Sequence, residues 1–159
     1  MRLSFSPDDP VDPLLQRLEH FCAFRERCGQ EVGQKLSELK VPAAKTGVIM
    51  KHLKENGFLD DARFARSFSG SKFRNNKWGR IKIRYELKNR NIPDNVIREA
   101  LEAISEEDYL KTIRELILKK QEEIKTGKHL NIREKIITFV TGKGFEFDQI
   151  SEALKELKI

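Results

Sequence analysis

Ten lysines and arginines lie within residues 63–90, a stretch called here the basic segment. Among the side chains of this protein, they are the best suited to binding a ligand, in this case an anionic one. Glu86 is the only acid among them. The chain carries a formal charge of +6, and residues 58–104 supply five of those six charges, with eleven basic and six acidic side chains. A local cationic surplus of this kind favours contact with a polyanion such as the phosphate backbone of nucleic acid.

Part of this surplus forms a stripe. Arg80, Arg84 and Lys88 are spaced four residues apart, which places them on one face of a helix. Like charges at this spacing repel one another, and a bound anion would relieve the repulsion. We therefore expect contact with nucleic acid or a nucleoprotein through Lys72, Arg74, Lys77, Trp78, Arg80, Lys82, Arg84, Lys88 and Arg90.

The same residues permit other interpretations. Trp78 could stack on a base, or it could belong to the hydrophobic core. Ile81 and Tyr85 form an apolar stripe of their own, which we expect to pack between neighbouring units of the fold. The cations could also face an acidic protein, or meet no partner at all.

The histidines and cysteines do not form a recognisable site. His20, His52 and His129 are far apart in the sequence. Cys22 and Cys28 do not have the paired spacing of a structural zinc site. We expect both cysteines to be reduced and to act as small apolar residues on or near a buried helix face.

Two further patterns have simple structural explanations. Asp60 and Asp61 form a tight acid pair that could invite a metal, but helix capping explains Asp60 more simply. The Gly-Lys pairs at 127–128 and 142–143 lack the remaining residues of a phosphate-binding loop and are interpreted as helix ends. We therefore expect a protein with no catalytic residue, metal or cofactor.

Apolar residues recur at spacings of three and four along the whole chain, which predicts an all-α fold. The helices that we expect span residues 13–27, 30–39, 43–56, 61–75, 80–90, 93–104, 106–125, 132–143 and 147–158. Gly57, Asn91 and Gly144 are predicted to end helices in the left-handed conformation. Asp60 and Ser105 are predicted to begin helices.

An internal repeat organises these helices. With an offset of 53 residues, one apolar set aligns without a gap on another: Ile83, Leu87, Ile92, Ile97, Ala100 and Leu101 on Ile136, Val140, Phe145, Ile150, Ala153 and Leu154. A looser third copy begins at Leu36. The pattern predicts an elongated array of three tandem three-helix repeats, covering residues 1–57, 58–104 and 105–159.

Composition limits the class of protein. The chain is 38% hydrophobic and 35% charged, and no apolar run is long enough to span a membrane. The first residues do not form the apolar core of a signal peptide. We expect a cytoplasmic monomer without a membrane partner, with residues 1–13 as an extended arm.

Residues 57–92 combine a glycine, an apolar residue, two aspartates, a Phe-Ala pair, a basic stretch, a Trp-Gly pair and I-x₃-L followed by isoleucine. In this chain the pattern is carried by Gly57, Leu59, Asp60, Asp61, Phe64, Ala65, Trp78, Gly79, Ile83, Leu87 and Ile92. The combination resembles the RecX family of regulators of the RecA recombinase. Asn91 stands where the family usually has glycine, a change that a left-handed position tolerates.

The resemblance implies tandem three-helix repeats and a function. Members of the family bind in the groove of the RecA–DNA filament across neighbouring protomers, and inhibit ATP hydrolysis and strand exchange in recombination and DNA repair. We therefore expect the RecA filament, with the single- or double-stranded DNA within it, as the partner. The alternative is a stand-alone nucleic-acid-binding helical module without a recombinase partner.

Overall fold

The computed structural model describes residues 12–125 and 131–159, and within these residues the chain forms nine α-helices and no strand. None of these helices has the length and apolar character needed to cross a lipid bilayer. The helices are α1 Pro13–Phe24, α2 Gly29–Glu38, α3 Ala43–Glu55, α4 Asp61–Asn76, α5 Arg80–Asn89, α6 Asp94–Glu102, α7 Glu106–Lys125, α8 Ile132–Gly142 and α9 Phe147–Glu156.

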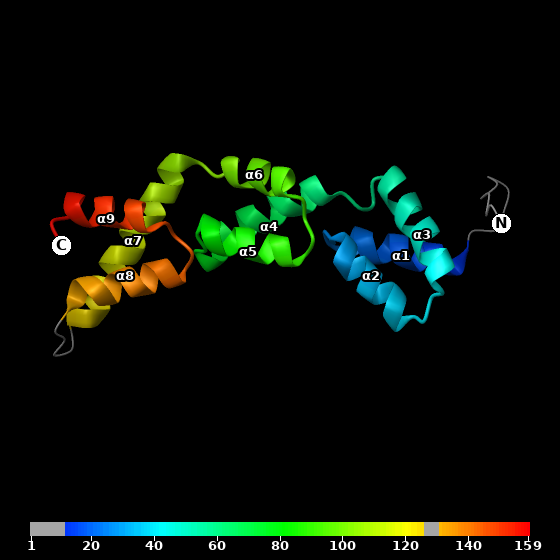
Figure 1. Ribbon diagram of the computed structural model, residues 1–159, viewed down its shortest axis with the longest axis horizontal. Helices are drawn as coiled ribbons and strands as arrows, with labels where there is room; N and C mark the ends of the chain where they lie inside the picture. The colour runs from blue at the N-terminus through cyan, green and yellow to red at the C-terminus, as the bar shows by residue number, and fades with distance from the viewer. Residues whose placement is uncertain (1–11, 126–130) are drawn as a thin grey trace.

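The helices are arranged as three successive sets along the long axis of the molecule (Figure 1). The first set is α1–α3, the central set α4–α6 and the third set α7–α9. The main helix–helix contacts, such as α4 with α6 and α7 with α8, lie within a set. The fold is thus an elongated all-α array of three three-helix repeats, which confirms the prediction from periodicity.

The register of the repeat is also confirmed. Every member of the two aligned apolar sets is buried, from Ile83 and Ile136 at the start to Leu101 and Leu154 at the end. The two sets therefore occupy equivalent core positions in the central and third helix sets.

The buried side chains form two hydrophobic cores rather than three. One core lies within the first helix set and also includes Leu59. The other core is continuous through the central and third sets and also includes Cys28 from the start of α2. At the joint between the first and central sets, Cys28 of the first set therefore enters the second core. Leu59, in the link before α4, enters the first core. Both cysteines are free and buried, as predicted.

The central and third sets are joined by their backbones. The Gly79 N–H donates to the Lys143 carbonyl at 2.8 Å, and the Ile81 N–H donates to the Gly144 carbonyl at 3.0 Å. The approach is so close that a Cβ atom at Gly79 would overlap the backbone of Gly144. The link before α5 and the link before α9 are thereby held together.

The predicted helix ends are confirmed where the structure describes them. Gly57, Asn91 and Gly144 all have positive φ. Ser105 Oγ accepts from the Asp108 N–H at 3.3 Å at the start of α7. Gly142 is the last residue of α8, as predicted, whereas the pair at 127–128 lies outside the described residues.

One boundary differs from its prediction by several residues. The helix expected over 13–27 ends at Phe24, because Arg25 is extended. The chain must leave the helix there so that Cys28 can reach the second core. Of the arm expected over residues 1–13, residues 1–11 lie outside the described part of the chain, and Pro13 is already in α1.

The residues of the 57–92 pattern have structural roles. Gly57 ends α3, Asp61 lies in the first turn of α4, and Gly79 precedes α5 at the joint between sets. Among the apolar members, Leu59 belongs to the first core. The members buried in the second core are Phe64, Ala65, Ile83, Leu87 and Ile92.

Asp60 begins α4, as predicted, because its Oδ1 accepts from the Arg63 N–H at 3.0 Å. Replacing Asp60 by alanine removes this acceptor, so the free energy of unfolding should fall by about 1 kcal/mol. Urea denaturation followed by circular dichroism measures the change. Asp60→Asn should retain most of the stability, since its side-chain oxygen can accept the same bond; an equal loss in both variants would contradict a capping role.

Candidate functional site

The basic segment covers the length of α4, the link after it and α5. α4 ends because Lys77 adopts the left-handed conformation, with φ of 57°, and the Trp78 N–H donates back to the Lys72 carbonyl at 3.1 Å. This reversal turns Trp78 inward and leaves Lys77 exposed. The cations of the segment are thus distributed over two helices and the tight link between them.

Trp78 packs against the core. It is partly buried, and its ring lies edge-on to Phe68 with 6.4 Å between the centroids. The ammonium groups of Lys72 and Lys82 lie over the indole at 4.9 and 4.5 Å from its centroid. Two cations therefore already occupy positions over the ring, which favours packing over base stacking for Trp78.

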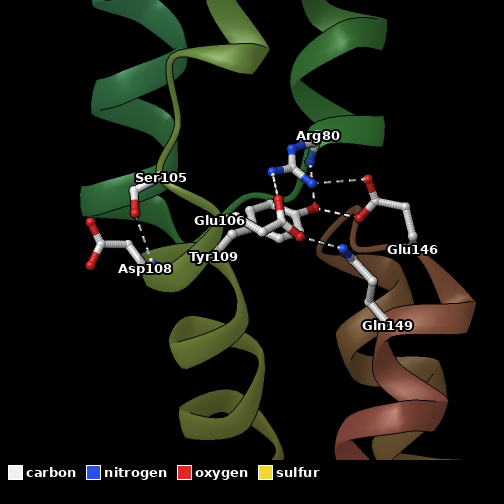
Figure 2. Close-up of polar contacts among 7 residues, drawn as sticks. All are labelled: Arg80, Ser105, Glu106, Asp108, Tyr109, Glu146 and Gln149. Atoms are coloured by element: carbon white, nitrogen blue, oxygen red, sulfur yellow. Dashed lines mark hydrogen bonds and ion pairs between the residues drawn. The ribbon is translucent and has the colours of Figure 1, made fainter.

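Arg80 is held inside the protein at the joint between the central and third sets (Figure 2). Its Nη2 lies 2.6 Å from Glu106 Oε2 and its Nη1 lies 4.0 Å from Glu146 Oε1. The guanidinium also covers the ring of Tyr109 at 3.9 Å, and only 18% of the side chain is exposed. Arg80 thus links α5 to residues at the starts of α7 and α9.

Tyr109 completes this cluster. Its hydroxyl accepts from the Arg80 N–H at 3.0 Å and donates to Glu146 Oε2 at 2.5 Å. Burial, reinforced by the bond to Glu146, raises the pKa of Tyr109 far above its ordinary value, so the phenol remains a donor at physiological pH. Gln149 donates to Glu106 Oε1 at 2.8 Å and holds that carboxylate in place.

Two other predicted cations also have internal partners. Lys88 Nζ lies 3.3 Å from Asp94 Oδ1, and Arg90 Nη1 lies 3.0 Å from Glu86 Oε2. Of the stripe Arg80, Arg84 and Lys88, therefore, only Arg84 lacks a carboxylate partner in the described chain. For Arg80 and Lys88, carboxylates of the protein itself can therefore relieve part of the repulsion within the stripe.

Four of the arginines without a carboxylate partner lie around the connection between α6 and α7. Arg66 and Arg74 line one hollow of about 310 Å³, and Arg84 and Arg98 line another of about 510 Å³ together with Arg80. Ile104 and Ser105 line both hollows, so the two lie on either side of the same connection. Within residues 12–125 and 131–159, no ion pair involves these four arginines or the exposed Lys77.

The apolar stripe of α5 is also exposed. Ile81 is 49% and Tyr85 is 63% exposed, so the prediction that they pack between units is wrong. The core contacts of α5 are made by Ile83 and Leu87 instead. Tyr85 follows Arg84 directly in α5, and both side chains are exposed.

Two arginines of this surface were not among the predicted site residues. Arg98 lies on α6, beyond the basic segment, and Arg66 lies on α4 within the basic segment but was not among the predicted contacts. Only the packing of α4 against α6 brings these two arginines to the same connection.

Among the described residues there is no group of three His, Cys, Asp or Glu side chains that could hold a metal ion.

Comparison with known proteins identifies the family. A profile described as RecX, second three-helix domain, matches residues 60–101. Regulatory protein RecX from Prosthecochloris aestuarii is 31% identical over 150 residues, which cover 94% of this chain and 97% of that protein. The chain belongs to the RecX family.

Other RecX proteins agree with this assignment. Regulatory protein RecX from Clostridium acetobutylicum is 34% identical over 133 residues, which cover 80% of this chain but only 61% of that longer protein. The crystal structure of RecX from Lactobacillus salivarius has the same fold, with a TM-score of 0.81 at 22% identity over 91% of this chain and 94% of that one. The Prosthecochloris and Clostridium relatives are named as regulatory proteins, not as enzymes.

Proposed function

We propose that this protein is a non-enzymatic regulator that binds the RecA–DNA filament and lowers its rates of ATP hydrolysis and strand exchange. Membership of the RecX family is the observation that carries this proposal. The elongated array supports it, because a long, narrow molecule can contact several protomers along a filament groove (Figure 1).

The unpaired cations of the central set would make the contact with phosphate. We propose Arg66, Arg74, Lys77, Arg84 and Arg98 as its main residues, because none of them forms an ion pair in the described part of the chain. Lys72 and Lys82 add to the positive field while they stabilise Trp78. Arg80, Lys88 and Arg90 contribute less, since acids already neutralise them.

We further propose residues 1–57, 58–104 and 105–159 as the units of this contact. Each range contains one complete helix set. The central unit would face the nucleic acid, and the outer units would extend the contact over neighbouring protomers.

The proposal predicts a loss of inhibition when these charges are neutralised. RecA ATPase on single-stranded DNA should fall when the protein is added. For an Arg74→Gln, Lys77→Gln, Arg84→Gln variant, the concentration for half-maximal inhibition should rise by about tenfold or more, because each charge contributes a charge-assisted contact. The measurement is steady-state ATP hydrolysis across a titration of each variant.

A matched control removes the same charge elsewhere. Lys111, Lys119 and Lys155 are exposed on the third set, outside the proposed phosphate contact, and their replacement by glutamine should weaken inhibition much less than the central triple variant does. An equal loss of inhibition in both triple variants would show a general effect of charge. If the unaltered protein did not change RecA ATPase activity at low salt, the proposal would be rejected.

A stand-alone nucleic-acid-binding module remains the second candidate, because the same unpaired cations would serve it. It predicts that the protein alone binds single-stranded DNA tightly, with an affinity that falls steeply as salt rises. Neutralising three phosphate contacts should then reduce the salt slope by about two units. Binding to free DNA that equals binding to the filament would favour this candidate.

A further inference from the structure

A second cationic surface lies on the first helix set, outside the basic segment. Phe24, at the end of α1, is 77% exposed, more than any other large hydrophobic side chain that the structure describes. Phe21 lies one turn earlier and is partly buried against the first core. Two phenylalanines are therefore open to solvent, wholly or in part, along one edge of α1.

Cations surround these rings. The Arg27 guanidinium lies 3.9 Å from the Phe21 centroid and donates to the Phe21 carbonyl at 3.1 Å, and the Lys35 ammonium lies 5.6 Å from the same centroid. The two phenylalanines and two cations line a hollow of about 210 Å³ with Arg17 and His20. We call these six residues the Phe24 surface.

The acids near this surface already have other side-chain partners. Glu19 Oε1 lies 2.9 Å from His52 Nε2, and Glu26 Oε1 lies 2.6 Å from Arg63 Nε. Glu31 lies 3.5 Å from Arg25 and also accepts from the Cys28 N–H.

The Phe24 surface is therefore a net positive patch, although the overall composition of the first helix set does not indicate one. Residues 1–57 carry nine basic and eight acidic side chains, which is nearly a balance. No carboxylate lines the hollow, however, and in the described part of the chain no ion pair involves Arg17, Arg27 or Lys35. An anionic group placed there would meet cations that have no carboxylate partner.

We propose that the Phe24 surface binds an acidic protein segment that inserts one large apolar side chain into the hollow. The carboxylates of the segment would pair with Arg17, Arg27 and Lys35, and its apolar side chain would cover Phe24. A hollow of this size suits a single side chain. The site lies on a different helix set from the surface of the proposed function and does not depend on it.

Charge alone would also suit single-stranded nucleic acid, but the rings favour a peptide. Nucleic-acid sites of this kind use successive open aromatic faces on which bases stack. Here the Arg27 guanidinium already lies over Phe21, so Phe24 is the one phenylalanine of the surface whose ring is freely exposed.

The test is fluorescence anisotropy with the full chain and a labelled peptide of aspartates and glutamates around one central phenylalanine. Phe24→Ser should weaken binding about tenfold, because the apolar contact is lost. Arg17→Glu should weaken it at low salt by a similar factor. Phe147→Ser is the matched control, since Phe147 is 56% exposed on α9, and it should bind as the unaltered protein does.

Three outcomes would overturn the assignment. A peptide with alanine in place of its phenylalanine could bind equally well, which would exclude insertion of an apolar side chain. Labelled oligothymidylate could bind in a manner that depends on Phe24, which would make the surface a nucleic-acid site. The acidic peptide could fail to bind at low salt. Circular dichroism should show unchanged helicity for all three variants, because the replaced side chains are exposed.

Discussion

Replacing Gly79 by alanine should lower the free energy of unfolding by about 3 kcal/mol, because the added methyl group meets backbone atoms that cannot move aside. The φ angle of Gly79 is −81°, which alanine adopts without strain. The cost therefore comes from the close approach of Gly144 and from the loss of the hydrogen bond between the Gly79 N–H and the Lys143 carbonyl. Urea denaturation followed by circular dichroism measures it.

The chain offers a matched control for this substitution. Gly47 lies inside α3, and a Cβ atom there would meet no atom within 4 Å. Gly47→Ala should therefore raise the free energy of unfolding by about 0.5–1 kcal/mol, since alanine loses less backbone entropy in a helix. If Gly79→Ala were as stable as the unaltered protein, the central and third sets would not be joined as the structure shows.

Replacing Arg80 by glutamate should cost about 3 kcal/mol of unfolding free energy, because it places a third carboxylate beside two that have lost their cation. Arg80 lies close to Glu106 and Glu146 and is mostly buried. Arg84→Glu, one turn along the same helix and exposed, should change stability by less than about 0.5 kcal/mol. Chemical denaturation of the two variants provides the comparison.

A charge swap tests the same contact independently. Arg80→Glu combined with Glu106→Arg should recover part of the lost stability, since the pair is restored in reverse. Equal costs for Arg80→Glu and Arg84→Glu, without recovery in the swap, would show that Arg80 does not support the joint. A binding test should therefore avoid Arg80, because its replacement affects folding as well as charge.

Local patterns predicted the helices and their ends well. The positive φ of Gly57 and Asn91 and the cap at Asp60 depend on residues within one or two turns of the chain. The repeat could be found because equivalent core positions, such as Ile83 and Ile136, keep the same spacing. These features are local or periodic, and the sequence displays them directly.

The partners of the charged residues could not be predicted in the same way. Glu106 and Glu146 are distant from Arg80 in the sequence, and only the joint between two helix sets brings the three together. Periodicity placed Ile81 and Tyr85 on a stripe, but it does not tell which of two apolar stripes on a short helix faces the core. The Phe24 surface was missed because near-equal counts of opposite charges do not reveal how those charges are paired.

The two joints of the array differ in kind, and this difference determines where the molecule can bend. Backbone atoms hold the joint at Gly79 and Gly144, whereas the joint at Cys28 is held largely by side-chain contacts such as Arg63 with Glu26 and the Gln30 amide with the Asn89 carbonyl. Side chains change rotamer more readily than backbones shift. The central and third sets should therefore move together as one rigid body. The first set should change its orientation relative to them at the joint near Cys28.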